Sequence, residues 1–267
     1  MSLTQHEVES FVTDGFVRID GAVAAPIARR CRDELWASTG YDPQDPATWT
    51  DTLVRVDNLA TPPFRQAATS PLLHEAFDQL VGPGRWLPRT GLGTFPLRFP
   101  GAGEAKEAGW HLEASFAGPD GEMRVNLRSR GRALLMLFLF SDVGPDDAPT
   151  LIRVGSHLDV PGHLQSHGDE GRAWLELCSA VVPASENRPI EIATGGIGDV
   201  YLCHPFLVHS AQQHRGHTPR FMAQPPLLPT QDLDLAAAQP TPVALAILRG
   251  LALSSDHEAH PAPGIFG

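Results

Sequence analysis

Residues 198–226 are GDVYLCHPFLVHSAQQHRGHTPRFMAQPP, in which three short apolar runs are separated by turns rich in glycine, proline and polar residues. Runs of this length, bounded by such turns, are typical of antiparallel strands. Similar runs fill the middle of the chain, at 86–98, 107–116, 132–140, 150–154 and 190–193. They do not alternate with helical segments, which argues against repeated strand–helix units. The sequence therefore predicts a mainly β protein built as an antiparallel sandwich or barrel.

Helical patterns lie on either side of this region. Apolar residues recur at helical spacing in three early segments, and another apolar run follows two prolines near the end: 4–13, 24–37, 70–81 and 243–253. Thr4 can cap the first helix. Ser70 as cap, with Pro71 at the first helical position, is a strong start signal for the third. We expect one domain over 1–267, with mainly helical support in 1–84, a β-rich core in 85–228, and a C-terminal helix and tail in 229–267.

Composition narrows the class of protein. The 267 residues are 42% hydrophobic and 19% charged, which suits a packed core. A net charge of −11 argues against nucleic acid or an anionic membrane surface as a partner. Three cysteines, no signal-peptide pattern at the N-terminus and no apolar run of membrane-spanning length favour a cytoplasmic location.

The segment GWHLEASF, residues 109–116, places His111 and Glu113 two residues apart in an apolar, strand-like context. Residues i and i+2 of a strand point to the same face, so both side chains can reach one metal ion. An isolated His-x-Glu is a weak signal, and a surface pair with a hydrogen-bonded histidine is the alternative. The flanking aromatic residues favour the metal site, because glutamate is seldom placed among them without a partner.

A third ligand is expected from the histidine-rich stretch near residue 209. His209 follows an apolar run and precedes small residues, which suits a buried ligand at a strand end. His204 would face the other side of a regular strand and is expected to be structural. His214 and His217 are expected to be exposed in a turn. Two histidines and one carboxylate form the facial triad that binds non-haem Fe(II) and leaves positions open.

Arg220 lies eleven residues beyond His209, in an apolar strand. A buried arginine needs an anionic partner. That partner is either a buried aspartate or glutamate, or the carboxylate of a ligand held by two parallel hydrogen bonds. With the triad, the second interpretation predicts an oxygenase that uses iron and a 2-oxo acid.

These residues together resemble the phytanoyl-CoA dioxygenase family of Fe(II)/2-oxoglutarate oxygenases. Four motifs occur in the family's order: FVTDGFVRIDGAV at 11–23, GWHLEASF at 109–116, DVGPDDAPTLIRVGSH at 142–157, and HPFLVHSAQQHRGHTPRF at 204–221. The chain departs from the family pattern in three places. Glu113 replaces the more usual aspartate, Arg153 stands where a proline is usual, and Ala211 stands where a hydroxyl residue is common.

The resemblance implies a double-stranded β-helix, a jelly roll of the cupin type, with N-terminal flanking helices. It implies that His111, Glu113 and His209 bind Fe(II) and that Arg220 pairs with the C5 carboxylate of 2-oxoglutarate. Arg55, and Thr94 in the expected strand 93–98, fall where the family contacts this co-substrate. With O2, the reaction implied is hydroxylation of a C–H bond in a small-molecule metabolite, with release of succinate and CO2.

Two other functions are compatible with the same residues. One is a metal-dependent cupin-type enzyme that does not use 2-oxoglutarate, which Arg220 disfavours. The other is a jelly-roll binding module without catalysis. Fold and cofactor do not determine the substrate.

A run of basic residues after the His-x-Glu segment bears on the substrate. RVNLRSRGR, residues 124–132, contains four arginines of one parity, which on a strand would form a single basic face: Arg124, Arg128, Arg130 and Arg132. Such a face beside the cleft would attract an anionic substrate, and Arg128 is the expected contact. A solvated hairpin whose arginines pair with surface acids is the alternative.

Overall fold

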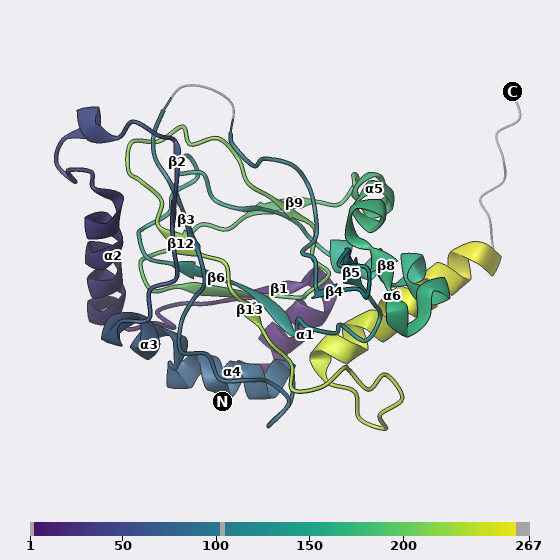
Figure 1. Cartoon of the computed structure of the whole chain (residues 1–267). Helices are drawn as coiled ribbons and strands as arrows, with labels where there is room; N and C mark the ends of the chain where they lie inside the picture. The colour runs from purple at the N-terminus through teal and green to yellow at the C-terminus, as the bar shows by residue number, and fades with distance from the viewer. Residues whose placement is uncertain (1–2, 102–104, 260–267) are drawn as a thin grey trace, which may run out of the picture.

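The computed structural model describes residues 3–101 and 105–259, with side chains as far as Ser255. Its largest sheet joins strands that lie far apart in the sequence, and all its pairings are antiparallel (Figure 1). The order is β1–β10–β6–β12, and β13 follows β12 along the same edge of β6. These strands are β1 (Phe16–Ile19), β6 (Leu134–Leu139), β10 (Val200–Cys203), β12 (Met222–Ala223) and β13 (Pro226–Leu227).

Three smaller antiparallel sheets complete the β structure. One has the order β11–β7–β9 and consists of β7 (Leu151–Arg153), β9 (Ile190–Ile192) and β11 (His209–Ser210). The second pairs β2 (Leu53–Val56) with β3 (Phe95–Arg98). The third has the order β4–β5–β8 and consists of β4 (Phe116–Ala117), β5 (Met123–Val125) and β8 (Arg172–Ala173).

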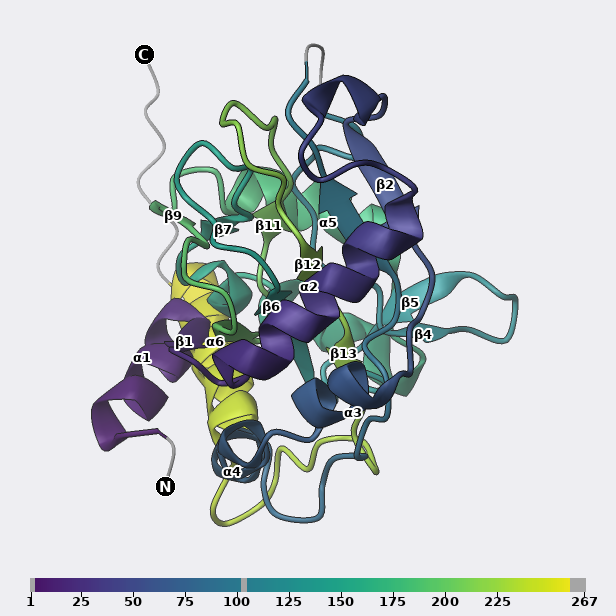
Figure 2. The ribbon, with the colours of Figure 1, turned by 90° about the vertical axis from the view of Figure 1, so that its left-hand side faces the viewer.

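Helices lie at both ends of the chain and surround the sheets (Figures 1 and 2). The α-helices are α1 (Gln5–Asp14), α2 (Ala25–Thr39), α3 (Pro62–Ala68), α4 (Pro71–Leu80), α5 (Trp174–Ala184) and α6 (Pro242–Ala259). Short 3-10 helices occur at Pro46–Thr48, Ser156–Leu158, Pro161–His163 and Gln165–Glu170. In Figure 2, α2 crosses in front of β6 and β12, and α3 lies below it. Among the described residues, no helix has the length and apolar character needed to cross a membrane.

Strand β6 is the centre of the core, because all six of its residues are buried. Its side chains alternate between two apolar clusters. Leu134, Met136 and Phe138 belong to the larger cluster, which includes the buried residues of the helices. The other three residues face a smaller cluster that contains Ile152 of β7. The main sheet is therefore packed between a helical layer and the sheet formed by β7, β9 and β11. Burying each large apolar side chain contributes roughly 1.5–3 kcal/mol.

The prediction of mostly antiparallel sheets with flanking helices is confirmed. The four predicted helices are present, and Thr4 caps α1 through a capping box with Glu7. The sequence pattern missed α3, which is only seven residues long and opens with two prolines. It also missed α5, whose residues are apolar on several sides and include Pro183, so that helical spacing is obscured.

Two local details differ from expectation. Ser70 stands at the N-cap of α4, as predicted, but its hydroxyl accepts no hydrogen bond from the helix amides and instead donates one to the carbonyl oxygen of Ala22. The segment with His111 and Glu113 is extended, yet the nearest strand begins only at Phe116. This segment is joined to the β structure by an isolated bridge between His111 and His209.

Gly15 ends α1 in the left-handed region, with φ of 91°, and a Cβ atom there would lie 2.5 Å from Nδ1 of His157. We expect Gly15→Ala to lower the free energy of unfolding by about 2–5 kcal/mol, because left-handed strain adds to overpacking. Urea denaturation measures the loss. Gly21→Ala is the matched control: φ is +59° and nothing lies within 4 Å of the added Cβ. Equal losses in the two variants would show that the contact with His157 does not matter.

Candidate metal centre

His111 and His209 are brought together by their own backbones. The amide of His111 donates to the carbonyl oxygen of His209 at 3.0 Å, and the amide of His209 donates to that of His111 at 2.9 Å. Paired residues of an antiparallel bridge project their side chains to the same face. The two imidazole centroids accordingly lie 4.5 Å apart. The bridge joins the loop before β4 to β11.

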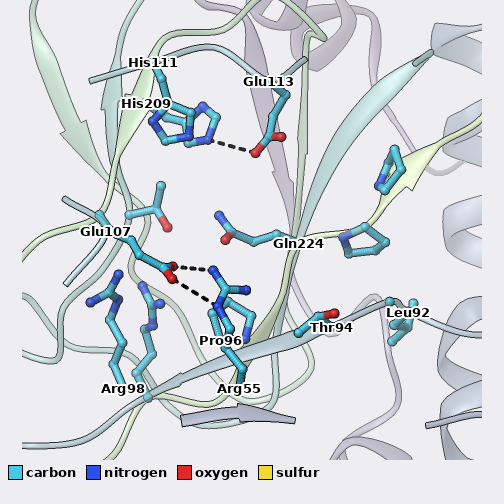
Figure 3. A pocket seen from close by; sticks show the side chains of 16 residues that line it. Arg55, Leu92, Thr94, Pro96, Arg98, Glu107, His111, Glu113, His209 and Gln224 are labelled. Atoms are coloured by element: carbon cyan, nitrogen blue, oxygen red, sulfur yellow. Dashed lines mark hydrogen bonds and ion pairs between the residues drawn. The ribbon is translucent and has the colours of Figure 1, made fainter. Parts of the chain in front are cut away.

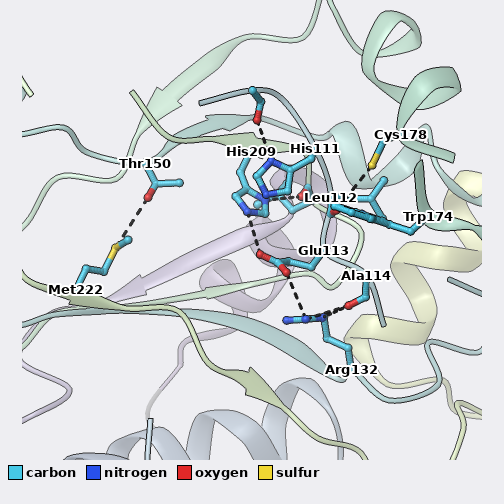
Figure 4. A network of polar contacts seen from close by, with 12 residues as sticks. His111, Leu112, Glu113, Ala114, Arg132, Thr150, Trp174, Cys178, His209 and Met222 are labelled. Carbon is cyan, nitrogen blue, oxygen red and sulfur yellow. Dashed lines mark hydrogen bonds and ion pairs between the residues drawn. The ribbon is translucent and has the colours of Figure 1, made fainter. Parts of the chain in front are cut away.

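Glu113 completes the group from the same face. One of its carboxylate oxygens, Oε1, lies 3.5 Å from Nε2 of His209 (Figure 4). One ligand atom from each of His111, Glu113 and His209 lies within 4.8 Å of the others. Leu112, between the two ligands, is fully buried, and its carbonyl oxygen accepts a hydrogen bond from Nε1 of Trp174 at 2.5 Å. The alternation expected of a strand therefore holds over these three residues, although they form no named strand.

Both imidazoles are fixed by backbone carbonyl groups. Nδ1 of His111 lies 2.8 Å from the carbonyl oxygen of Gly109, and Nδ1 of His209 lies 3.1 Å from that of Leu207. A proton on each Nδ1 leaves the lone pair of Nε2 free for a metal, as in many metal sites. Burial, together with the neighbouring His209, lowers the pKa of His111, which keeps the ring neutral and able to bind metal.

Glu113 is ionised under ordinary conditions. Burial acts to raise its pKa, but the hydrogen bond with His209 and the charge of Arg132 outweigh this and lower the pKa to about 2. Arg132 contacts the second carboxylate oxygen, Oε2, at 3.4 Å. Its guanidinium is held in place by the carbonyl oxygen of Ala114, at 3.2 Å from Nε and 3.0 Å from Nη2. Oε2 is thus engaged by Arg132, while Oε1 faces the histidines.

His111, Glu113 and His209 lie at one end of a cavity of about 370 Å³ (Figure 3). Charged and polar side chains make up much of the rest of its lining: Arg55, Thr94, Arg98, Glu107, Thr150, Arg220 and Gln224. Ala211, Leu92 and three prolines are among the apolar residues that complete it. The structure therefore brings together all of the predicted site residues except Arg128.

Arg220 has no carboxylate partner among the residues that the structure describes. Its side chain is buried, with 2% exposed, and Nη1 donates to the carbonyl oxygen of Ala148 at 2.5 Å. Its Nε atom is buried without a hydrogen-bond partner. Burial and the nearby charge of Arg98 lower the pKa of Arg220 to about 9. The alternative of a salt bridge to a buried acid thus finds no partner in the described part of the chain.

Arg55 and Thr94 lie at the exposed side of the cavity. Arg55, in β2, makes a two-pronged ion pair with Glu107, in which Nε lies 3.0 Å from Oε1. About half of each side chain is exposed. Thr94 is exposed and directly precedes β3. The mouth of the cavity therefore lies beside these three residues.

The sequence did not single out Arg98, Glu107 or Gln224 as site residues, and it placed Arg132 on a basic face and not beside Glu113. Arg98 had the clearest signal, since it is a single charge within the apolar run FPLRFP at 95–100. Glu107 and Arg132 reach the site only through contacts with distant segments, and no local pattern marks them.

The other histidines are separate from the site. His204 is fully buried, and its Nε2 lies 3.2 Å from the carbonyl oxygen of Val243, so its predicted structural role is confirmed. His217 is exposed, as predicted. The expectation for His214 is wrong, because its ring is buried and its Nε2 lies 2.8 Å from the carbonyl oxygen of Thr218. The turn folds back on itself and encloses this ring.

The predicted basic face is also wrong. Strand β5 ends at Val125, and a turn follows, so the four arginines share no strand. Each of them contacts an acid: Arg124 pairs with Asp120, Arg128 with Asp169, Arg130 with Asp232, and Arg132 with Glu113. This arrangement is close to the alternative of arginines paired with acids, with the difference that Arg132 turns inward.

No family model and no curated protein matches the sequence. Solved structures match its fold. SnoN, a non-heme alpha ketoglutarate dependent epimerase from nogalamycin biosynthesis, is 18% identical, with a TM-score of 0.58 over 84% of this chain and 80% of its own. HygX from Streptomyces hygroscopicus, with nickel, 2-oxoglutarate and hygromycin B bound, is 18% identical, with a TM-score of 0.54 over 87% and 90%. EctD from S. alaskensis is 18% identical, with a TM-score of 0.55 over 85% and 76%.

At this identity the comparison shows a shared fold. The neighbouring structures also show which ligands that fold holds in them: Fe3+ and alpha ketoglutarate in SnoN, and nickel with 2-oxoglutarate, or iron, in HygX. This chain has a group of His111, Glu113 and His209 that could hold a metal ion.

The contribution of Arg132 to metal binding by Glu113 can be tested by substitution. Replacing Arg132 with methionine frees Oε2 and lets the carboxylate rotate, so we expect affinity for Ni(II) to fall about 10–100-fold, as for other partners of metal ligands. Isothermal titration calorimetry measures the affinity. Arg130→Met is the matched control, because Arg130 pairs with Asp232 and does not contact Glu113. An equal change in both variants would contradict a specific role for Arg132.

Proposed function

We propose that this protein is an Fe(II)- and 2-oxoglutarate-dependent oxygenase that hydroxylates a C–H bond of a small molecule. The observation that carries the proposal is the convergence of His111, Glu113 and His209 on a cavity that also contains Arg220, a buried arginine without a carboxylate partner in the described chain. The first three match the donor set of non-haem Fe(II) enzymes. The fourth matches the need of a dicarboxylic co-substrate for a buried cation.

The donor chemistry fits Fe(II) in particular. Two imidazoles and one carboxylate leave several coordination positions open, unlike closed structural sites. Bound Fe(II), together with 2-oxoglutarate and O2, supplies the oxidising power for C–H cleavage, with release of succinate and CO2. Because Arg132 engages Oε2 of Glu113, this carboxylate is arranged to offer a single oxygen.

The remaining residues bind and orient. Arg220 would hold the C5 carboxylate of 2-oxoglutarate in a fork of two parallel hydrogen bonds. Thr94 and Arg55, which line the cavity together with Gln224, are proposed to contact 2-oxoglutarate as well. A buried guanidinium that is already held by Ala148 loses little entropy when an anion arrives, which favours tight binding.

We also propose a family and a β architecture for this protein. The two facing sheets, with β6 buried between layers, are compatible with a double-stranded β-helix, and the four sequence motifs resemble the phytanoyl-CoA dioxygenase family. The neighbours SnoN and SnoK are an epimerase and a carbocyclase. Hydroxylation is thus one of several outcomes that this fold supports, and it is the one proposed here.

A turnover assay separates this function from the two alternatives. Purified protein with Fe(II), 2-oxoglutarate and O2 is expected to form succinate slowly without substrate and faster with a suitable one. Glu113→Asp should keep part of this activity because an oxygen donor remains, whereas Glu113→Ala should lose most of it. His217→Ala, at an exposed position, is the control. O2 uptake on a substrate without 2-oxoglutarate would indicate a cupin-type enzyme, and binding without any turnover would indicate a binding module.

The proposed binding of 2-oxoglutarate by Arg220 can be tested separately. Arg220→Lys keeps the charge but removes the planar fork, so the KM for 2-oxoglutarate should rise markedly. Losing one partner of a buried charge pair costs about 2–5 kcal/mol of binding. Arg215→Lys, at an exposed position in the same loop region, should leave the KM unchanged. An unchanged KM in Arg220→Lys would assign Arg220 a structural role.

A further inference from the structure

Two buried arginines, Arg98 and Arg220, lie side by side in the cavity because their backbones are hydrogen-bonded to each other. The amide of Arg98 donates to the carbonyl oxygen of Arg220 at 2.9 Å, and the amide of Arg220 donates to that of Arg98 at 2.8 Å. This antiparallel bridge places both side chains on the same face. Their exposed fractions are 5% and 2%, and both line the cavity that holds the metal ligands. Arg98 therefore stands beside Arg220 and reaches the same space.

Neither guanidinium is satisfied by the protein. Arg98 donates one hydrogen bond from Nη2 to the carbonyl oxygen of Lys106 at 3.0 Å, and Arg220 donates one from Nη1 to that of Ala148. The Nε atoms of both arginines are buried without a partner. Within the described chain, neither side chain forms an ion pair with a carboxylate. Since an arginine has five N–H donors, most of their hydrogen-bonding capacity is unused.

Two like charges this close are unfavourable without an anion between them. The charge of Arg98 contributes to lowering the pKa of Arg220. Glu107 exerts an attractive charge effect on Arg98, but both of its carboxylate oxygens bind Arg55. Buried arginines are normally paired or bound to a ligand. Arg98 and Arg220 therefore require an anion that the described part of the protein does not supply.

We propose that Arg98 and Arg220 together form a two-arginine clamp for a single carboxylate, the distal carboxylate of the 2-oxo acid co-substrate. This inference rests on the proposed function and adds Arg98 to it as a binding residue. Figure 3 shows Arg98 at the opposite end of the cavity from His111, His209 and Glu113. A co-substrate bound at the metal by its 2-oxo acid end would extend its other end toward the clamp.

The clamp has a consequence for selectivity. Each arginine can donate charge-assisted hydrogen bonds to the distal carboxylate, and a 2-oxo acid that lacks this group would leave two buried cations unpaired. The site should therefore discriminate strongly against monocarboxylic 2-oxo acids. The effect depends on Arg98 as well as on Arg220.

The test uses the nickel-loaded protein and measures binding without turnover. Calorimetric titration with 2-oxoglutarate is compared with titration with 2-oxopentanoate, which has the same chain length and no distal carboxylate. In Arg98→Gln the affinity for 2-oxoglutarate should fall about 10–100-fold, as expected for loss of charge-assisted hydrogen bonds. The affinity for 2-oxopentanoate should stay the same or rise. Arg98→Lys should lie between the wild type and Arg98→Gln.

Arg89→Gln is the matched control, because Arg89 is a half-buried arginine bound to the carbonyl oxygens of Gly91 and Pro226 and does not line the cavity. Two results would overturn the clamp: unchanged 2-oxoglutarate binding in Arg98→Gln while Arg220→Gln is weakened, or equal weakening of both ligands in Arg98→Gln. In either case the proposed function stands. Nickel-loaded wild type that binds no 2-oxoglutarate would instead overturn the proposed function, and the clamp with it.

Discussion

Mutual backbone hydrogen bonds between distant residues are the constraint on which the site depends. One bridge joins His111 to His209 and another joins Arg98 to Arg220, and each links a residue at the end of a strand, His209 of β11 or Arg98 of β3, to a loop residue. An isolated bridge fixes the relative position of two residues without requiring a continuous ladder. The core supports both bridges, since each segment is next to buried apolar residues such as Leu112, Phe99 and Phe221. The candidate metal ligands and the buried arginines are thus positioned by the same kind of backbone bridge at two ends of one cavity.

The electrostatics of the cavity differ between those ends. At the end with the candidate metal ligands the protein balances its own charge, because Arg132 contacts Glu113 and Glu113 stays ionised. At the mouth, Arg55 and Glu107 also balance each other. Arg98 and Arg220 alone among the lining cations of the described chain have no carboxylate partner. A folded protein keeps such groups at a cost in stability, which is characteristic of sites that bind ligands rather than of structural cores.

The sequence was informative where chemistry and spacing are local. His111 and Glu113 could be predicted because a period of two needs only three residues, and His209 and Arg220 because their residue types and apolar context stand out. Helix α1, with Thr4 at its start, and helix α4, with Ser70 and Pro71 at its start, were found for the same reason. Arg98 and Arg132 depend on pairing between segments far apart in the chain, and this pairing has no local signature. The basic face failed because a turn after Val125 breaks the alternation on which it relied.

Two chains that are only 18% identical can share a fold for a physical reason, and the same reason explains why the shared fold says little about the substrate. A buried sheet needs apolar residues of suitable volume and period, and many sequences meet that condition. A metal centre adds only a few fixed positions. In the proposed function the substrate would enter at the mouth, where Arg55, Glu107 and Thr94 are exposed and lie outside the core. Because Arg55 and Glu107 already bind each other, a polar substrate group must compete with that ion pair to contact either of them. The chain can therefore share the fold of its structural neighbours while the residues at its mouth differ from theirs in kind and in pairing, as the conditions on the buried sheet do not extend to them.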